Sequence, residues 1–581
     1  MTNPDKVIYF AETDARNSRV RFGIKQKDRS RHVYVIGKTG MGKSTLLENM
    51  AAQDIQSGNG MCFIDPHGKT AELMLEYIPK ERIDDVLYFA PFDMDYPISF
   101  NIMEDVGYDK RHLVVSGLMS AFKKIWKDAW SARMEYILSN TLFALLEYPD
   151  ATLLSVNRML SDKTFRKKVV ENITDTAVKS FWVDEFANYT ERMAAEAVPA
   201  IQNKVGQFTS NPLIRNIIGQ PKSSFDFREM MDTQKIIIIN LSKGRMGDAN
   251  AQLLGALLVT KIYLAAMSRA DVGPHEIETL PDFSLFVDEF QTFANDSFAE
   301  ILSEARKYKL NLHITHQYVE QMPEEVRAAV FGNVGTLITF RIGSLDADLF
   351  EKEFAEVFTQ QDIVNLGQFQ LYLRLMIDGV SSKPFSAKTL PPFPVLEPNF
   401  VQEVIDASRN KYAKSRKEVE DEVAHLTNLG RENNIKSHEP KKDRRPKKQS
   451  RPNTAIPKES IFNNDVVNKK PKPLISKDKE IEIKKQLEEV QKKVIDEDIS
   501  EEKEEFVSLK QVVQKPGQKE ISKENKNALK SALLQVLQQN SVEKKLEDKQ
   551  KEKINTKNSS NKKTIQPGEI PEDELKKMME V

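Results

Sequence analysis

The sequence predicts an α/β protein with a mostly parallel sheet, an all-helical insertion and a charged tail. Short apolar runs alternate with helical stretches over residues 1–106 and again over residues 220–400, as in a parallel sheet whose strands are joined by helices. The periodicity is helical throughout residues 107–219, which we interpret as a small domain inserted between strands. Residues 401–581 are charged and poor in aromatic side chains, so we expect a mostly disordered tail with possible short helices.

Two sets of apolar runs are interpreted as the strands of this sheet. The first set lies at residues 7–10, 20–24, 33–36, 60–65 and 85–89. The second set lies at residues 235–241, 283–287, 311–315, 336–342 and 370–377. Most of these runs are apolar throughout instead of alternating, as expected for strands covered by helices on both faces. A proline-rich segment, residues 391–394, then leads out of the globular part, which we expect to end near residue 400.

Within the insertion, Trp126 and Trp130 share a helical stripe with Phe122 and Ile125. Tryptophan pairs can stack on nucleic-acid bases. We favour core packing for this pair because the stripe is apolar along its length.

Composition limits the setting of the protein. The formal net charge of -1 combines an acidic excess before residue 400 with a basic excess after it. The single cysteine, Cys62, excludes a disulfide framework within the chain and fits a reducing compartment. The first residues are polar, so no signal peptide is expected, and the apolar stretch 253–267 contains Lys261 and is too short to span a bilayer. We expect a cytoplasmic protein without a transmembrane segment of its own.

A glycine-rich stretch links the strand at residues 33–36 to a helix. It comprises Gly37, Lys38, Thr39, Gly40, Met41, Gly42, Lys43, Ser44 and Thr45. The pattern G-x-x-x-x-G-K-S in a strand–loop–helix setting is the phosphate-binding loop. Its backbone N–H groups surround the phosphates, Lys43 reaches the β- and γ-phosphates, and the Ser44 hydroxyl helps to hold Mg²⁺. The sequence therefore predicts a nucleotide site, with ATP and Mg²⁺ as cofactors.

The strand at residues 283–287 ends in two adjacent carboxylates, Asp288 and Glu289. Buried strands seldom end in paired acids without a cation nearby, because isolated buried charge is costly. We expect Asp288 to hold Mg²⁺ and Glu289 to orient and polarise the attacking water. This pair favours hydrolysis by the chain itself over switching alone.

Four further residues are candidates for the same site. Gln317 ends a Thr-His-Gln corner, where it could sense the γ-phosphate or the attacking water. Arg306 is the first candidate for stabilising charge on the transferred phosphoryl group, although an ordinary ion pair would also explain it, and Arg341 is the alternative. Asp65, at the end of a strand, fits either a second shell around Mg²⁺ or a tight turn.

Five motifs together resemble those of the HerA/FtsK superfamily of DNA-pumping ATPases. They lie at residues 37–44, 63–68, 285–289, 304–307 and 315–317. The branch that looks most similar is the TraG/TraD-like conjugative coupling proteins of type IV secretion systems, and the resemblance covers about residues 1–395. It implies a RecA-like P-loop NTPase core with an all-helical insertion in the motor domain.

The resemblance also implies a hexameric ring, ATP at subunit interfaces, an arginine from the neighbouring subunit that matches Arg306, and DNA threaded through the pore. Secretion-channel or relaxosome proteins at the inner membrane are the implied partners. Coupling proteins usually begin with transmembrane helices, which we do not expect in this sequence. HerA-like DNA end processing and an ATPase for protein secretion or pilus assembly therefore stay open as alternatives. A non-hydrolysing nucleotide-binding scaffold is the alternative from another class.

Three features stand out in the tail. Residues 441–448 form a basic block that could contact DNA or anionic lipid, or act only as a solubilising tether. Residues 481–495 and 529–537 have helical patterns, and the second has an apolar stripe suited to docking on a partner.

Overall fold

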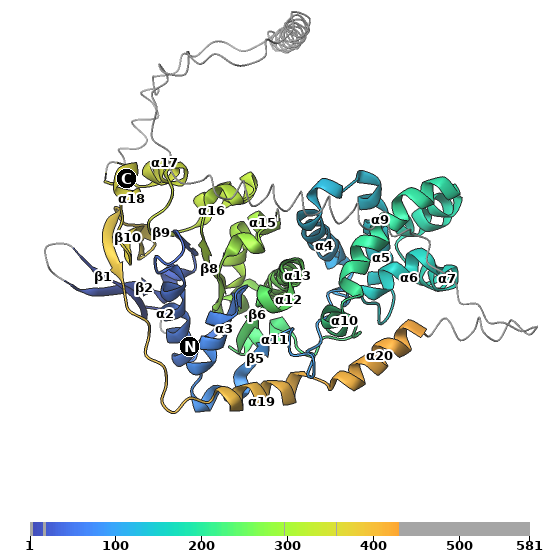
Figure 1. Cartoon of the computed structure of the whole chain (residues 1–581), viewed down its shortest axis with the longest axis horizontal. Helices are drawn as coiled ribbons and strands as arrows, with labels where there is room; N and C mark the ends of the chain where they lie inside the picture. The colour runs from blue at the N-terminus through green and yellow to red at the C-terminus, as the bar shows by residue number, and fades with distance from the viewer. Residues whose placement is uncertain (1–3, 15–18, 296, 356, 429–581) are drawn as a thin grey trace, which may run out of the picture. The chain divides into compact units, whose positions relative to one another are not determined.

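The computed structural model describes residues 4–14, 19–295, 297–355 and 357–428 (Figure 1). All described residues belong to one unit of the chain, Met1–Arg445. The basic block and the two helical patterns predicted in the tail lie outside the described residues.

An 11-stranded sheet runs through the first unit, in the spatial order β2-β1-β13-β10-β9-β3-β8-β7-β4-β6-β5. All neighbouring strands from β9 to β5 pair in parallel, whereas the pairs from β2 to β9 are antiparallel. The predicted α/β class with a mostly parallel sheet is confirmed. The strands are β1 (Val7–Thr13), β2 (Arg21–Lys25), β3 (Val33–Ile36), β4 (Gly60–Asp65), β5 (Val86–Phe89), β6 (Ile236–Asn240), β7 (Phe283–Val287), β8 (Leu310–His316), β9 (Thr336–Thr339), β10 (Gln370–Arg374) and β13 (Phe385–Thr389).

The antiparallel part differs from the sequence prediction. The run 370–377 was expected to be one strand, but β10 ends at Arg374 and a separate hairpin follows, made of β11 (Met376–Ile377) and β12 (Val380–Ser381). β13 was not predicted, because its short, half-polar sequence next to Pro384 looks like a loop. It becomes a strand by pairing with both β10 and β1.

The parallel register gathers the predicted motifs at one edge of the sheet. β3 lies between β8 and β9, so that Ile36 is aligned with His316 and with Thr339. The strand that ends before Asp288, β7, lies on the other side of β8. Because parallel strands end at the same edge, the phosphate-binding loop, Asp288 and the corner after β8 emerge side by side. β8 thus lies between β3, which precedes the phosphate-binding loop, and β7, which ends before Asp288. This order of strands is the predicted RecA-like arrangement.

Alternate residues of each parallel strand face two different cores. Val33 and Val35 face the side covered by α2 (Lys43–Gln56) and α3 (Lys69–Glu76), whereas Tyr34 and Ile36 face the opposite side. This double burial explains why the strands read as continuous apolar runs. The other helices of the motor region are α1 (Gln26–Arg29), α11 (Phe227–Asp232), α12 (Lys243–Met246), α13 (Asp248–Met267), α14 (Pro274–Thr279), α15 (Ser297–Glu304), α16 (Glu324–Asn333), α17 (Ser344–Glu353) and α18 (Gln360–Val364).

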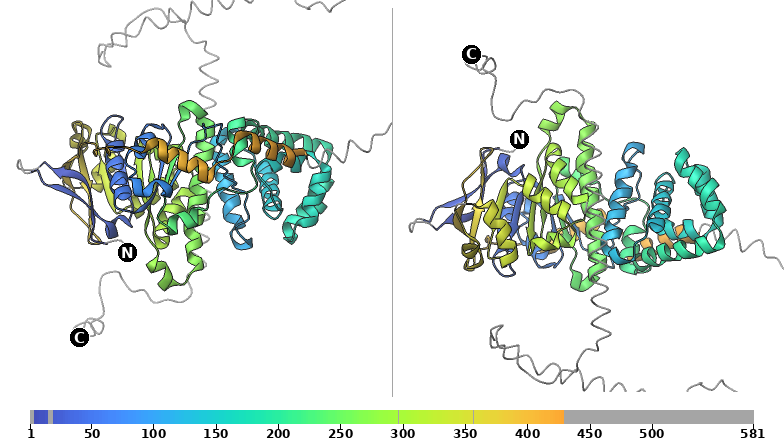
Figure 2. Two further views of the ribbon diagram at one scale, coloured as in Figure 1. Left: turned by 90° about the horizontal axis from the view of Figure 1, so that it is seen from below. Right: turned by 90° about the horizontal axis from the view of Figure 1, so that it is seen from above.

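The insertion expected at residues 107–219 is helical, and its first long helix packs on α13 (Figure 2). Gly117 allows this close approach, since a Cβ there would lie 2.3 Å from the Thr260 side chain. One continuous apolar core joins the sheet, α13 and the insertion. Its helices are α4 (Arg111–Ile125), α5 (Ala132–Leu146), α6 (Leu154–Ser161), α7 (Lys163–Asn172), α8 (Thr176–Ser180), α9 (Glu191–Thr209) and α10 (Pro212–Ile218).

The two tryptophans of the insertion take part in its packing. Trp126 contacts the rings of Phe122 and Phe208, with centroids 5.7 and 5.4 Å away. The indole N–H of Trp130 donates to Glu135 at 3.0 Å, and both tryptophans are partly buried against the core. These contacts are those of the core packing favoured above.

α13 continues into a short turn, and the segment Asp248–Asp271 is long and apolar enough to cross a membrane by length and composition. The sequence prediction of a helix too short for this was wrong, because the helix extends toward its N-terminus through polar residues. However, 72% of the segment's most apolar window is buried within the fold. A helix that is apolar on all sides is expected where both sides are covered, here by the sheet and by α4.

The globular fold does not end near residue 400. α19 (Val401–Tyr412) packs on β5, and α20 (Arg416–Asn428) reaches α10 (Figure 1). Val404 is fully buried, the Ser408 hydroxyl accepts a hydrogen bond from the Tyr88 N–H at 2.9 Å, and Arg409 pairs with Asp93 at 2.8 Å. The boundary was misplaced because a few spaced apolar residues are enough to dock a charged helix on an existing surface.

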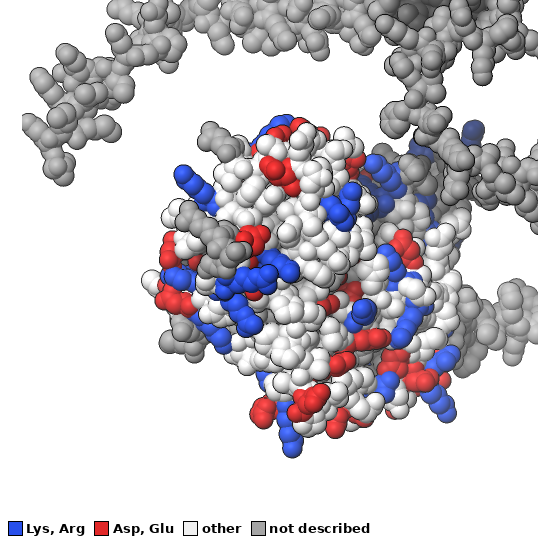
Figure 3. Space-filling view, turned by 60° about the vertical axis from the view of Figure 1, so that its left-hand side comes forward, with Lys and Arg blue, Asp and Glu red and all other residues white. Residues whose placement is uncertain are grey.

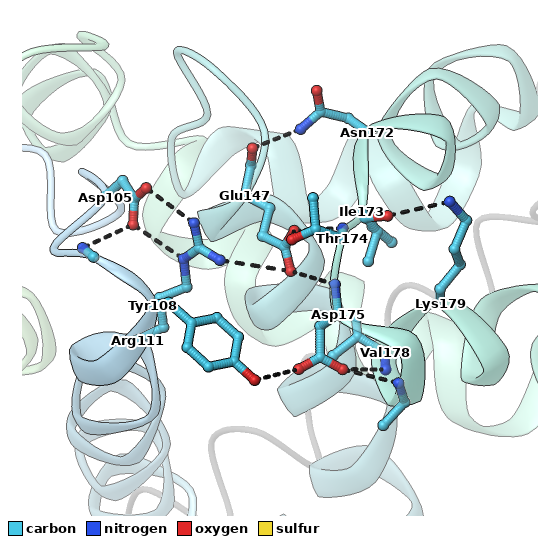
Figure 4. A network of polar contacts seen from close by, with 12 residues as sticks. Asp105, Tyr108, Arg111, Glu147, Asn172, Ile173, Thr174, Asp175, Val178 and Lys179 are labelled. Atoms are coloured by element: carbon cyan, nitrogen blue, oxygen red, sulfur yellow. Dashed lines mark hydrogen bonds and ion pairs between the residues drawn. The ribbon is translucent and has the colours of Figure 1, made fainter.

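A polar network fixes the start of the insertion (Figure 4). The carboxylate of Glu147, at the end of α5, accepts hydrogen bonds from the N–H and hydroxyl of Thr174 at 2.6 Å each and from the Asp175 N–H at 3.3 Å. Arg111, the first residue of α4, lies 3.6 Å from Glu147 and forms a two-pronged pair with Asp105 at 3.0 Å. The network ties the segment that enters α4 to α5 and to the turn before α8.

Candidate nucleotide site

The phosphate-binding loop has the backbone that its glycines permit. Gly40 and Gly42 take φ values of 76° and 116°, which other residues adopt only under strain. A Cβ at Gly42 would also lie 3.0 Å from the ring of Phe369. Lys38, Thr39 and Gly40 are exposed, so the loop is open to solvent on its outer side.

Neighbouring strands anchor this loop. The Gly37 N–H donates to the His316 carbonyl at 3.2 Å, and the Lys38 N–H donates to the Arg341 carbonyl at 2.8 Å. The ammonium of Lys43 reaches back across the loop to the Lys38 carbonyl at 3.3 Å. Burial lowers the pKa of Lys43, while the negative charges of the acids after β7 oppose this change. Lys43 thus lies within the loop, as its role in phosphate binding requires.

Asp288 is buried and held by two hydroxyls. The Ser44 hydroxyl donates to Asp288 Oδ2 at 3.0 Å, and the Thr315 hydroxyl donates to Oδ1. Burial raises the pKa of Asp288; the hydrogen bonds from Thr315 and Ser44 lower it, and the negative charges of Asp65 and Glu289 raise it further. No lysine or arginine of the described residues forms an ion pair with Asp288 or Glu289 within 4.0 Å.

This arrangement fits Mg²⁺. A hydroxyl and a carboxylate are hard oxygen ligands, and Mg²⁺ is commonly bound by one or two protein oxygens together with phosphates and water. The described residues contain no group of three or more His, Cys, Asp and Glu side chains suited to hold a metal by themselves. Ser44 and Asp288 are therefore suitably placed to hold a nucleotide-bound cation.

Glu289 sits in the unusual left-handed backbone region, with φ 47°. Its N–H donates to the Thr315 hydroxyl at 3.1 Å, which keeps the residue in this conformation. Both carboxylate oxygens accept hydrogen bonds from amides: Oε1 from Gln317 at 2.6 Å and Oε2 from Gln291. The structure thus brings Glu289, the candidate catalytic carboxylate, and Gln317, the candidate sensor, into direct contact.

His316, next to Gln317, is part of the buried core. Its Nδ1 lies 3.1 Å from the Tyr34 hydroxyl, and its ring is fully buried. Burial lowers the pKa of His316 to about 3, and the positive charges of Lys43 and Lys124 contribute. The imidazole is therefore neutral at physiological pH.

Sequence reasoning missed two residues of the site, Thr315 and Gln291. A hydroxyl that ends the strand next to the acidic strand was a usable signal for Thr315. Gln291 lies in the turn η8 (Phe290–Thr292), and nothing in the sequence distinguishes it from other polar turn residues. Its contact with Glu289 depends on how that turn folds.

The two candidate arginines lie at opposite edges of the sheet. Arg306 is exposed in the turn η9 (Ala305–Tyr308), which precedes β8. The seven residues of β8 span about 20 Å from this turn to the nucleotide edge. Arg306 is therefore far from the nucleotide site of its own chain. Arg341 follows β9 at the nucleotide edge, where its carbonyl binds the loop.

Asp65 is used by its own turn. Its Oδ1 accepts the His67 N–H at 2.7 Å, and its Oδ2 accepts the Ala71 N–H at 3.0 Å. Of the two open interpretations, this geometry favours the tight turn, which starts α3. Asp65 acts on the site through its charge, which raises the pKa of Asp288.

Replacing Thr315 with Val should raise the Mg²⁺ concentration needed for nucleotide binding about 10- to 100-fold, because a group that orients a metal ligand is removed. Mg²⁺ titration of fluorescent ATP-analogue binding measures this. Thr141→Val is the matched control, since this buried hydroxyl binds only the Ile137 carbonyl in α5. An unchanged Mg²⁺ dependence in the Thr315 variant would contradict the role given to its hydroxyl.

Comparison with known proteins decides the family. The model of the type IV secretory system conjugative DNA transfer family matches residues 4–330, more than half of the chain. The chain belongs to this family. The predicted resemblance to conjugative coupling proteins is confirmed, and the protein is a P-loop NTPase of conjugative DNA transfer. A search of curated proteins gives no match.

Solved structures with a similar fold were also found. The plasmid coupling protein TrwB in complex with ADP and Mg²⁺ is 17% identical, with a TM-score of 0.49, over 65% of this chain and 88% of that chain. The unbound form of TrwB is 15% identical, with a TM-score of 0.48, over 65% and 89%. VirB4 of Thermoanaerobacter pseudethanolicus is 12% identical, with a TM-score of 0.43, over 67% and 98%.

Proposed function

We propose that this member of the family hydrolyses ATP and uses the reaction to move DNA for conjugative transfer. The observation that supports hydrolysis is the position of Glu289, held by Gln317 and Gln291 directly beside Asp288 and the phosphate-binding loop. A nucleotide-binding scaffold would not need a second, separately held carboxylate at this edge.

The residues suggest how the reaction proceeds. The loop and Lys43 hold the triphosphate, and water attacks the γ-phosphorus, so that the bond to the β,γ-bridging oxygen breaks and ADP and phosphate form. Glu289 orients this water and accepts its proton. Mg²⁺, held by Ser44 and Asp288, would neutralise charge on the phosphate oxygens. Each carboxylate oxygen of Glu289 accepts one amide hydrogen bond and keeps a lone pair that can accept one from water.

We propose that the active form is a ring, which the family resemblance suggests as a hexamer. An exposed Arg306 at the edge opposite its own nucleotide site is suited to complete the site of a neighbouring subunit. Arg341 would act within the same chain. Purified Arg306→Ala subunits mixed with Lys43→Ala subunits distinguish the two, because an arginine that acts in trans allows partial recovery of activity.

DNA would contact only part of the surface. Figure 3 shows basic and acidic side chains interspersed on one face of the molecule, without a continuous basic patch. Lys25 and Lys27 each pair with Asp378, at 2.6 and 2.9 Å. DNA binding depends on basic groups close to the phosphates. In a ring, the pore alone has to supply them.

ATP hydrolysis by the full-length chain, measured with and without DNA, tests the proposal. We expect DNA to stimulate hydrolysis and Lys43→Ala to abolish it, with ATP and DNA together driving assembly into a six-fold ring. Hydrolysis that is indifferent to DNA would favour a motor for protein secretion. A chain that binds ATP without hydrolysing it would be a scaffold, and the proposal would be wrong.

A further inference from the structure

One lysine of the helical insertion contacts the turn that follows Glu289. Lys124 is the second-last residue of α4, and its ammonium donates hydrogen bonds to the carbonyls of Gln291 at 2.7 Å and Thr292 at 2.8 Å. Both carbonyls belong to η8, which begins directly after Glu289. The contact therefore joins the insertion to the nucleotide edge of the sheet.

Lys124 is held by backbone carbonyls and not by an acid. It forms no ion pair within 4.0 Å with any carboxylate of the described residues. Burial lowers the pKa of Lys124 to about 7, and the negative charge of Asp248 opposes this change. Removing an ammonium from water without a carboxylate partner costs free energy. A lysine that serves only solubility would instead extend into solvent, as long side chains readily do.

The contact continues to the carboxylate itself. Lys124 holds the Gln291 carbonyl, and the side-chain amide of the same Gln291 donates to Glu289 Oε2. A shift of the end of α4 would therefore move the η8 backbone and, with it, the amide that holds Glu289. α4 also packs along α13 and against α5 in the insertion.

We propose that Lys124 is a positioning residue for ATP hydrolysis, which fixes the turn after Glu289 and so links the helical insertion to the reacting groups. The inference rests on the proposed function, because it assumes that Glu289 acts in hydrolysis. Lys124 contacts neither nucleotide nor water in this role; it acts through Gln291 and the backbone of η8.

Lys124→Met tests the proposal, because methionine keeps most of the unbranched side chain and removes the donors. We expect kcat for ATP hydrolysis to fall about 10- to 100-fold, as for a small misplacement of a catalytic group, while KM and nucleotide affinity change less than about twofold. Lys124→Arg should recover most of kcat, since arginine can donate to the same two carbonyls. If Lys124→Met acted only by destabilising the fold, it would lower the amount of active protein, and Lys124→Arg would not restore kcat.

Lys123→Met is the matched control. Lys123 is the adjacent residue of α4 and pairs with Glu135 at 2.6 Å within the insertion. We expect wild-type kcat from this variant. If Lys124→Met keeps wild-type kcat, or if Lys123→Met loses as much, the positioning role is wrong while the proposed function stands.

Amide hydrogen exchange separates this inference from the proposed function. Exchange at Thr292 and Phe293, whose N–H groups donate within this turn, should be faster in Lys124→Met than in the wild type or Lys123→Met, whether or not the chain hydrolyses ATP. If the wild type shows no hydrolysis, the proposed function fails, and faster exchange still supports the structural link. Unchanged exchange in Lys124→Met overturns the inference in either case.

Discussion

Replacing Glu289 with Gln is expected to lower kcat for ATP hydrolysis about 10²- to 10⁴-fold while ATP remains bound. The amide keeps the size of the side chain but cannot accept a proton from water. Asp288 and Ser44 are untouched by the change, so the groups that we propose to hold the nucleotide and its cation stay in place. Steady-state hydrolysis and equilibrium binding of a fluorescent ATP analogue measure the two quantities separately.

The matched control for this change is Glu325→Gln, an exposed glutamate in α16. It should hydrolyse ATP at the wild-type rate. A Glu289→Gln variant that keeps more than about a tenth of wild-type kcat would contradict the assignment of Glu289 as the base, given the usual size of general-base effects. Loss of nucleotide binding in that variant would instead indicate that Glu289 mainly supports the loop.

Replacing Asp54 with Ala should destabilise the fold by about 3–5 kcal/mol, the typical cost of leaving one charge of a buried pair without its partner. Asp54 and Arg29 are fully buried and joined by two hydrogen bonds, of 2.8 and 2.6 Å. Arg29 also bonds to Ser284, in β7, at 3.0 Å. Without Asp54, the buried guanidinium of Arg29 would keep only neutral hydrogen-bond partners, such as Gln26 and Ser284. Urea denaturation followed by tryptophan fluorescence measures the loss.

Asp348→Ala is the control for this prediction. It removes the partner of Lys352 in a pair of 3.5 Å whose side chains are 60% and 72% exposed. Exposed pairs contribute about 1 kcal/mol or less, so this variant should unfold at nearly the wild-type urea concentration. The prediction fails if the Asp54 variant is as stable as the Asp348 variant.

Much of the nucleotide site was predictable because its chemistry is local in sequence. The glycines, Lys43 and Ser44 occupy consecutive positions between one strand and one helix, and Asp288 and Glu289 directly follow another buried strand. A pattern of this kind predicts its own backbone, and parallel strands place their ends at one edge. The antiparallel extension by β13 was missed, because a short half-polar strand becomes recognisable only beside its partners.

The helical end of the chain shows the same limit. α19 and α20 have the charged composition of the tail that follows, yet Val404 and Tyr412 are buried against the sheet and its neighbours. Local composition predicted a boundary near residue 400 because it contains no information about an apolar surface elsewhere in the chain. The position of that boundary depends on docking.

By itself, the sequence predicted an α/β P-loop NTPase with a helical insertion, and it supplied the residues that we propose to hold phosphate, cation and water. Only the tertiary structure decided that Thr315 and Gln291 join the site, that Arg306 lies at the far edge, and that Lys124 reaches the turn after Glu289. Thr315 and Asp288 are 27 positions apart in the sequence, and Lys124 and Thr292 are 168 positions apart. The contact between Gln291 and Glu289 depends on how the turn η8 folds. Strand order, strand register and the packing of α4 on α13 bring these residues together. None of these three features can be predicted from a short stretch of sequence.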